Sequence, residues 1–185
     1  YGFFNYYGAE DAERVIIAMG SVTEAAREAI DHLVANGEKV GLVSVHLYRP
    51  FSAKHFLAAV PATAKRIAVL DRTKEPGANG EPLFLDVKEC FYGKENAPVI
   101  VGGRYGLGSK DTTPAQILAV YENLALPTPK DHFTIGIVDD VTFTSLPQKE
   151  EIALGGEGMF EAKFYGLGAD GTVGANKNSV KIIGD

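Results

Sequence analysis

The chain has 185 residues, of which 45% are hydrophobic and 23% are charged, a globular composition that excludes a disordered protein. Lys and Arg number 18 and Asp and Glu number 24, which gives a net charge of −6. Nucleic acids and anionic membranes attract cationic surfaces, so this balance argues against either as a partner. No apolar run is long enough to span a membrane, and the first residues do not form a signal peptide.

Cys90 is the single cysteine. Its isolation excludes an intrachain disulfide and any all-cysteine metal or iron–sulfur site within these residues. We expect Cys90 to be a small buried residue in a reducing compartment. Because the chain also lacks an initiator Met, we expect it to be a piece of a larger protein.

Short apolar runs alternate with helical patterns, which is typical of a parallel sheet covered by helices. Strands are expected at 15–19, 39–47, 67–70, 99–101 and 133–137. Helices are expected between them, at 21–36, 52–60, 83–92 and 113–124. The sequence therefore predicts an α/β domain over residues 12–141, a three-layer sandwich with a mostly parallel five-stranded sheet.

Local signals mark where three of these helices begin. Ser21 and Glu24 fit a capping box, and Ser52 suits the N-cap of the second helix. Thr113 followed by Pro114 begins the last helix, because proline at the first helical position lacks only a hydrogen-bond donor that would be unused there.

The composition changes after Val141. Residues 142–158 carry a proline and a glycine-rich stretch, which predicts a linker. A strand is expected at 159–165, followed by a glycine loop and a helix from about 173 to 183. One strand and one helix cannot bury their own apolar faces, so we expect residues 159–185 to be the truncated start of a second α/β domain.

Three glycines, Gly166, Gly168 and Gly171, match the pattern G-x-G-x-x-G between that strand and that helix. Glycines let the backbone approach a phosphate closely, and a helix N-terminus offers free N–H donors. Lys177, one turn into the helix, adds a positive charge. The competing interpretation is a tight glycine turn that packs against a neighbouring strand.

Two further loops follow parallel strands and are expected at the ligand-binding edge of the sheet, one containing Lys74 and the other Arg104. Arg104 has the geometry to pair with a phosphate or carboxylate, although tight turns or domain contacts explain both loops equally well. Asp139 and Asp140 are adjacent and point in opposite directions in an extended chain, so we expect loop contacts from them. The four histidines show no metal-ligand spacing.

Several stretches, in family order, resemble pyruvate:ferredoxin (flavodoxin) oxidoreductase. They are Gly20-Ser21-Val22-Thr23-Glu24, Leu47-Tyr48-Arg49-Pro50-Phe51, Val69-Leu70-Asp71-Arg72-Thr73-Lys74-Glu75-Pro76-Gly77, Gly103-Arg104-Tyr105-Gly106-Leu107 and Gly136-Ile137-Val138-Asp139-Asp140-Val141. The stretch from Gly171 to Gly184 resembles the opening of the family's gamma domain. The remainder resembles the domain of the enzyme that is built like the transketolase C-terminal domain.

The resemblance implies a large, homodimeric, cytoplasmic enzyme of anaerobic metabolism. Such enzymes use thiamine diphosphate with Mg²⁺ to decarboxylate pyruvate, pass electrons through 4Fe-4S clusters to ferredoxin or flavodoxin, and release acetyl-CoA. The domains that carry these cofactors are absent here, so we expect this chain to bind no cofactor, to hold no catalytic residue, and to act with the remaining domains of the same enzyme.

The gamma domain of this family is associated with coenzyme A, its substrate. The resemblance therefore implies a partial site for the phosphates of coenzyme A at Gly166, Gly168, Gly171, Gly174, Asn176 and Lys177. Two alternatives remain at this point. One is an independent dinucleotide- or CoA-binding module that uses the loop from Gly166 to Gly174, and the other is a purely structural module.

Overall fold

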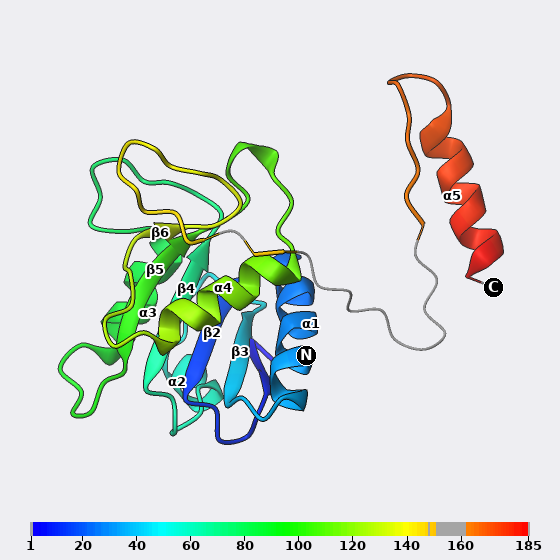
Figure 1. The fold of residues 1–185 in the computed structure, drawn as a ribbon. Coiled ribbons are helices and arrows are strands. Elements are labelled where there is room, and N and C mark those ends of the chain that lie inside the picture. The colour runs from blue at the N-terminus through cyan, green and yellow to red at the C-terminus, as the bar shows by residue number, and fades with distance from the viewer. Residues whose placement is uncertain (1, 148, 151–161, 185) are drawn as a thin grey trace. The chain divides into compact units, whose positions relative to one another are not determined.

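The computed structural model describes residues 2–147, 149–150 and 162–184, drawn in colour in Figure 1. Contacts divide the chain into two units, Tyr1–Ala153, called the sheet unit below, and Leu154–Asp185, called the tail unit. Within the described ranges, no helix has both the length and the apolar character needed to cross a membrane.

The sheet unit contains one sheet of six strands in the order β1-β3-β2-β4-β5-β6. The strands are β1 Phe4–Gly8, β2 Arg14–Met19, β3 Val40–Val45, β4 Arg66–Asp71, β5 Val99–Arg104 and β6 Phe133–Thr134. Strand β1 pairs antiparallel with β3, and every other pair is parallel. The predicted α/β class is thus confirmed. The prediction of five strands missed β1, and β6 is shorter than the expected 133–137.

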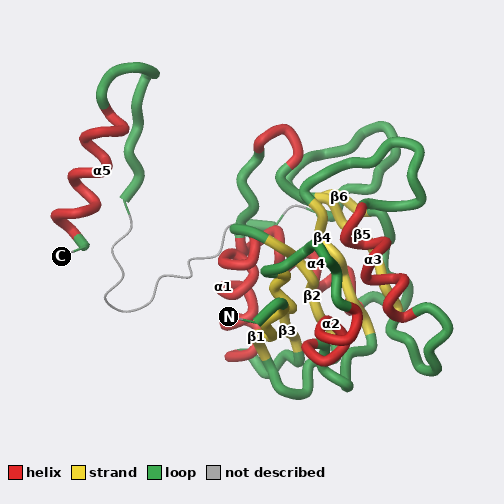
Figure 2. Tube along the Cα trace, turned by 180° about the vertical axis from the view of Figure 1, so that it is seen from behind, coloured by secondary structure: helices red, strands yellow, loops and turns green. Residues whose placement is uncertain are grey.

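Helices cover both faces of this sheet, as Figures 1 and 2 show. They are α1 Val22–Ala35, α2 Ala53–Ala59, α3 Pro82–Phe91 and α4 Pro114–Ala125, with a short 3₁₀ turn at Leu107–Ser109. One apolar cluster joins α1 and α4 to the sheet, and the other joins α2 and α3. These two clusters make the three-layer arrangement that the sequence predicts.

The central strands are buried on both faces. In β2, Ile16 and Ala18 belong to the cluster under α1 and α4, whereas Val15 and Ile17 belong to the opposite cluster. All four side chains are fully buried. Burying a large aliphatic side chain stabilises a fold by roughly 1.5–3 kcal/mol, so these continuous apolar runs are the main source of stability.

The helices begin differently from the local predictions. Ser21, Ser52 and Thr113 do occupy N-cap positions, but none of their side chains makes a capping hydrogen bond, so the predicted capping box at Ser21 is wrong. At α1 the hydroxyl of Thr23 instead donates to the carbonyl of Gly20 at 2.7 Å. At α2 the Ser52 hydroxyl contacts the ring Nδ1 of His55 at 2.7 Å.

Helix α3 is capped from the sheet. The Asp71 carboxylate, at the end of β4, accepts the backbone N–H groups of Leu83 at 3.0 Å and Phe84 at 3.1 Å. Burial raises the pKa of Asp71, and the two amide hydrogen bonds oppose that shift. A side chain 12 residues earlier in the chain therefore supplies the acceptor that a local cap normally provides.

The segment after β6 packs on the sheet edge. Thr134 forms a β-bridge with Ser145, and the N–H of Leu146 donates to the carbonyl of Thr134 at 2.9 Å. Leu146 is buried in the core. These contacts involve the first residues of the predicted linker 142–158, much of which lies outside the described residues. The predicted domain boundaries stay a prediction.

The described part of the tail unit contains α5 Thr172–Ile183, where a helix is expected. The strand expected at 159–165 lies partly outside the described residues, and residues 162–165 do not form a strand.

The buried hydroxyl of Tyr121 tests the packing between α4 and the sheet. It donates to the carbonyl of Gly41 at 2.9 Å, so Tyr121→Phe removes a buried hydrogen bond and should lower the free energy of unfolding by about 1–2 kcal/mol. Urea denaturation measures the change. Tyr92→Phe is the matched control, since Tyr92 is 84% exposed, and equal effects of the two variants would contradict the packing described.

Candidate functional site

The loops after β2, β4 and β5 meet at the carboxyl edge of the sheet, where open α/β sheets bind ligands. They enclose a hollow of about 270 Å³ next to the start of α1. Exposed Arg72 and Lys110 give this hollow a positive lining, which Asp111 partly offsets. Arg72 lies against Gly106, whose φ of 61° favours glycine, and a Cβ there would approach Nε of Arg72 to 2.8 Å.

Arg104, a candidate ligand-binding residue, is engaged within the sheet unit. Its Nε lies 2.6 Å from Oε1 of Glu81, and only 1% of the Glu81 side chain is exposed. A buried carboxylate is costly without a counter-charge, so this pair holds the loop before α3 against the end of β5. Arg104 does not line the hollow at the carboxyl edge, and neither does Lys74, which is exposed.

Of the two adjacent carboxylates after β6, Asp139 is engaged in its own loop. Asp139 accepts the N–H groups of Val141 and Thr142, both at 3.0 Å, and the hydroxyl of Thr144 at 2.8 Å. It also accepts the hydroxyl of Thr142, and this bond contributes most to lowering the pKa of Asp139. The predicted loop contacts are confirmed for Asp139.

The glycine loop of the tail unit is organised around Asp170, which sequence reasoning did not single out. Its carboxylate accepts the N–H groups of Leu167 at 2.9 Å and Thr172 at 3.0 Å, as well as the Thr172 hydroxyl. The Thr172 hydroxyl contributes most to lowering the pKa of Asp170, to about 2. The spacing Asp-Gly-Thr is the signal that predicts such a turn.

The six predicted site residues lie in this loop and in the first turns of α5. Gly168 and Gly171 adopt φ values of 121° and 81°, which favour glycine. Gly166 lies close enough to Thr172 that a Cβ there would approach its hydroxyl oxygen to 2.9 Å. Gly174 and exposed Lys177 are in the helix.

Among the six predicted site residues, Asn176 differs in that its side-chain oxygen is buried and has no hydrogen-bond partner within the described part of the chain. The residue lines a hollow of about 500 Å³ together with Phe164, Val180 and Ile183. The glycine loop and this hollow are the parts of the tail unit with the geometry to contact a ligand.

Metal-ligating side chains are dispersed. Across residues 2–147, 149–150 and 162–184, no group of three or more His, Cys, Asp or Glu side chains is placed to hold a metal ion. Cys90 is half-buried against the α2 and α3 cluster, and burial raises the pKa of its thiol.

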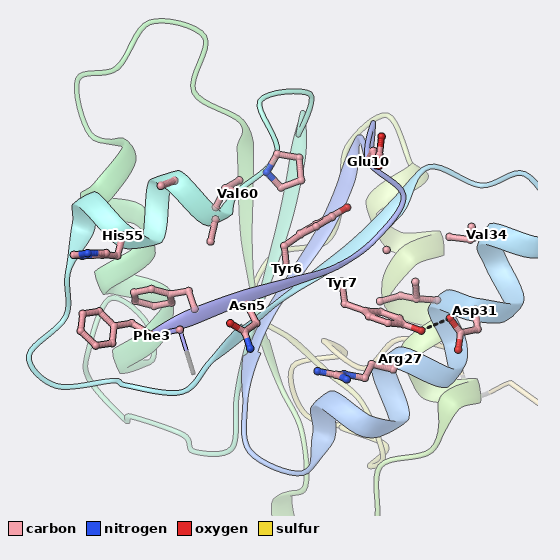
Figure 3. Close-up of a pocket in the computed structure, with 17 residues that line it drawn as sticks. Phe3, Asn5, Tyr6, Tyr7, Glu10, Arg27, Asp31, Val34, His55 and Val60 are labelled. Carbon is pink, nitrogen blue, oxygen red and sulfur yellow. Dashed lines mark hydrogen bonds between the residues drawn. The ribbon is translucent and has the colours of Figure 1, made fainter.

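A third hollow, of about 1170 Å³, runs along β1 at the edge of the sheet. Figure 3 shows β1 passing between α2, which contributes His55 and is followed by Val60, and α1, which contributes Arg27 and Asp31. Sequence reasoning missed this groove because it did not predict β1.

Comparison with known proteins connects these features to a family. The chain is 63% identical over 186 residues to pyruvate-flavodoxin oxidoreductase of Klebsiella pneumoniae, and 60% identical over 185 residues to pyruvate:ferredoxin oxidoreductase of Moorella thermoacetica. Both matches cover all of this chain and 16% of the relative, so the chain spans about one sixth of the relatives' length. The probable pyruvate-flavodoxin oxidoreductase of Escherichia coli is 53% identical over 188 residues, covering 98% of this chain and 16% of that protein.

This chain is also similar to a solved structure, 2-oxoglutarate:ferredoxin oxidoreductase from Magnetococcus marinus. The TM-score is 0.49 and the sequence identity is 23%, and the match covers 68% of this chain and 20% of that chain. Residues 12–117, more than half of the chain, match the family described as pyruvate:ferredoxin oxidoreductase core domain II. The resemblance seen in the sequence motifs is therefore confirmed, and the chain belongs to the pyruvate:ferredoxin oxidoreductase family.

Proposed function

We propose that the polypeptide containing this chain oxidatively decarboxylates pyruvate to acetyl-CoA and CO₂ and passes the electrons to ferredoxin or flavodoxin. The observation that carries this proposal is 60–63% identity over the whole chain to enzymes named for these reactions. The chain spans 16% of their length, so the activity requires the remaining domains. The same resemblance supports a cytoplasmic homodimer that uses thiamine diphosphate, Mg²⁺ and 4Fe-4S clusters.

Within that enzyme we infer a structural role for the sheet unit. Its buried charged groups serve its own fold, since Asp71 binds the amides of α3 and Glu81 pairs with Arg104. A 4Fe-4S cluster needs four ligands, normally cysteines, and the single cysteine does not fit one. We therefore propose that the cluster sites lie in other domains, that the thiamine diphosphate site does so by the same resemblance, and that the sheet unit orders its neighbours.

Assays of the isolated chain test whether the cofactor sites lie in other domains of the enzyme. Purified and reconstituted with iron and sulfide, it should show no iron-dependent absorbance, and with pyruvate, coenzyme A and thiamine diphosphate it should not reduce a viologen dye. The full-length polypeptide, assayed in parallel, should do both. A brown isolated chain containing acid-labile sulfide would show that the cluster ligands lie within these residues.

For the tail unit we propose a partial site for the phosphates of coenzyme A, at the start of a domain that continues past residue 185. The amides of Val173 and Gly174 support it, because they precede the first intrahelical donor of α5, the N–H of Ala175, which bonds to the carbonyl of Gly171 at 3.1 Å, and are available to an anion. Lys177 adds a positive charge one turn further on. The Asp170 carboxylate opposes an incoming phosphate, so the balance between these charges sets the affinity.

An independent dinucleotide-binding module has less support. That fold needs a strand directly before the glycine loop, and residues 162–165 do not form one. The match to the oxidoreductases covers all of this chain, and therefore includes the loop.

Charge substitutions in the full-length polypeptide test the coenzyme A site. Lys177→Gln should raise the KM for coenzyme A by about two- to fivefold, the effect of one exposed charge, at an unchanged KM for pyruvate. Asp170→Asn should lower the KM for coenzyme A, since it removes the repelling charge and keeps one acceptor oxygen. Lys181→Gln, in the last turn of α5, is the matched control. A KM that responds equally to the Lys177 and Lys181 substitutions would place the phosphates elsewhere.

A further inference from the structure

The two edge strands of the sheet, β6 and β1, differ in whether their outer backbone groups are paired. At β6, the segment through Ser145 covers the edge, since Thr134 donates to the carbonyl of Thr144 at 3.2 Å and accepts from Leu146 at 2.9 Å. At the opposite edge, β1 pairs with β3 on one side and borders the 1170 Å³ groove on the other. Within the described residues, β1 is thus the strand with an open edge.

The pairing of β1 shows which of its backbone groups face that groove. The carbonyl of Phe3 accepts the N–H of His46 at 2.9 Å, and the N–H of Ala9 donates to Val40 at 3.0 Å. In an antiparallel pair the hydrogen-bonding groups of alternate residues point toward the same neighbour. The backbone N–H and C=O groups of Asn5 and Tyr7 therefore point toward β3. Those of Phe4, Tyr6 and Gly8 point toward the groove.

Strand β1 itself contains none of the features that keep exposed strands from pairing, although Arg27 and Asp31 of α1 lie beside it. Natural edge strands are protected by charged side chains, prolines or bulges. The sequence of β1 is Phe-Asn-Tyr-Tyr-Gly, without a charge or a proline, and its register with β3 runs without interruption from Phe4 to Gly8. An unprotected edge of this kind is a template for another strand.

The groove has the size and lining that a strand requires. Five residues of strand, at ~3.4 Å rise, ~4.8 Å spacing and ~10 Å between layers, occupy about 800 Å³, which fits within 1170 Å³. Ile30 and Val34 of α1 line one wall beside Arg27 and Asp31, and Ala59 of α2 with the adjoining Val60 lines the other. Phe3 is 44% exposed and Val34 is 39% exposed, so apolar surface remains to be covered.

We propose that an extended segment of the same polypeptide, outside these 185 residues, pairs with β1 as an added strand in the full-length protein. Its side chains alternate between the apolar walls, so it carries apolar residues on both faces. The relatives are about six times as long as this chain, which leaves most of the polypeptide to supply the strand. Such a segment is present at high effective concentration, whereas a second copy must overcome the entropy of association.

Hydrogen exchange resolved to single amides tests the proposal, with an internal control in the same strand. In the isolated chain, the amides of Phe4, Tyr6 and Gly8 should exchange rapidly, while those of Asn5 and Tyr7 are protected by β3. In the full-length polypeptide, both sets should be protected, by at least a hundredfold for the first set. Rapid exchange of Phe4, Tyr6 and Gly8 in the full-length polypeptide would overturn the proposal. Protection that rises with concentration in the isolated chain and involves a second copy would overturn it too.

A proline at Tyr6 separates backbone pairing from side-chain packing. Tyr6→Pro removes an N–H that faces the groove, and prolines are tolerated at edge strands, so the isolated chain should keep its circular dichroism spectrum. In the full-length polypeptide, Tyr6→Pro should abolish the protection of the Phe4 and Gly8 amides from hydrogen exchange. Tyr6→Ala should leave that protection unchanged. Equal protection in the two variants would contradict strand pairing. If Tyr6→Pro unfolds the sheet unit, the wild-type comparison between the two sets of amides still decides.

Discussion

Burial of the central strands on both faces is the constraint on which the sheet unit depends. The side chains from Val15 to Ala18 in β2 and from Ile67 to Val69 in β4 are fully buried, so helices must cover both sides of the sheet. Parallel strands need long crossovers, and α1 to α4 provide them while burying the apolar faces. The crossovers in turn bring the loops after β2, β4 and β5 to one edge of the sheet.

At that edge the charged groups mostly serve the fold. Asp71 caps α3, and Arg104 neutralises Glu81, so the ends of β4 and β5 and the start of α3 are held together by buried polar contacts. Removing one partner of a buried pair is costly, which makes these groups poor candidates for binding a substrate. At the opposite side of the sheet, β1 offers a backbone edge beside a groove with partly apolar walls, which suits another protein segment and fits the proposed role of ordering neighbouring domains.

The parallel strands and their helices were predictable because their patterns are local. Runs such as Val15 to Met19 are rich in β-branched residues, and the helices show apolar residues at helical spacing. Strand β1 was not predictable, since Asn5 and Gly8 weaken its pattern and its strand conformation depends on pairing with β3. The Arg104 and Glu81 pair joins residues 23 positions apart, and no local rule connects them. In the tail unit the glycine motif was visible, while the hydrogen bonds of Asp170 to Leu167 and Thr172 were missed, and the coenzyme A site stays a prediction.

The sheet unit buries its own central strands, whereas we propose that the tail unit is the start of a domain that other parts of the full-length polypeptide complete. Amide hydrogen exchange along α5 of the isolated chain tests it most directly. Helix α5 has no buried residue among those described, while Ile16 and Ile17 are fully buried, so α5 amides should exchange through local opening and those of Ile16 and Ile17 only through global unfolding. Protection of α5 equal to that of β2 would contradict the claim and make the tail unit stable on its own.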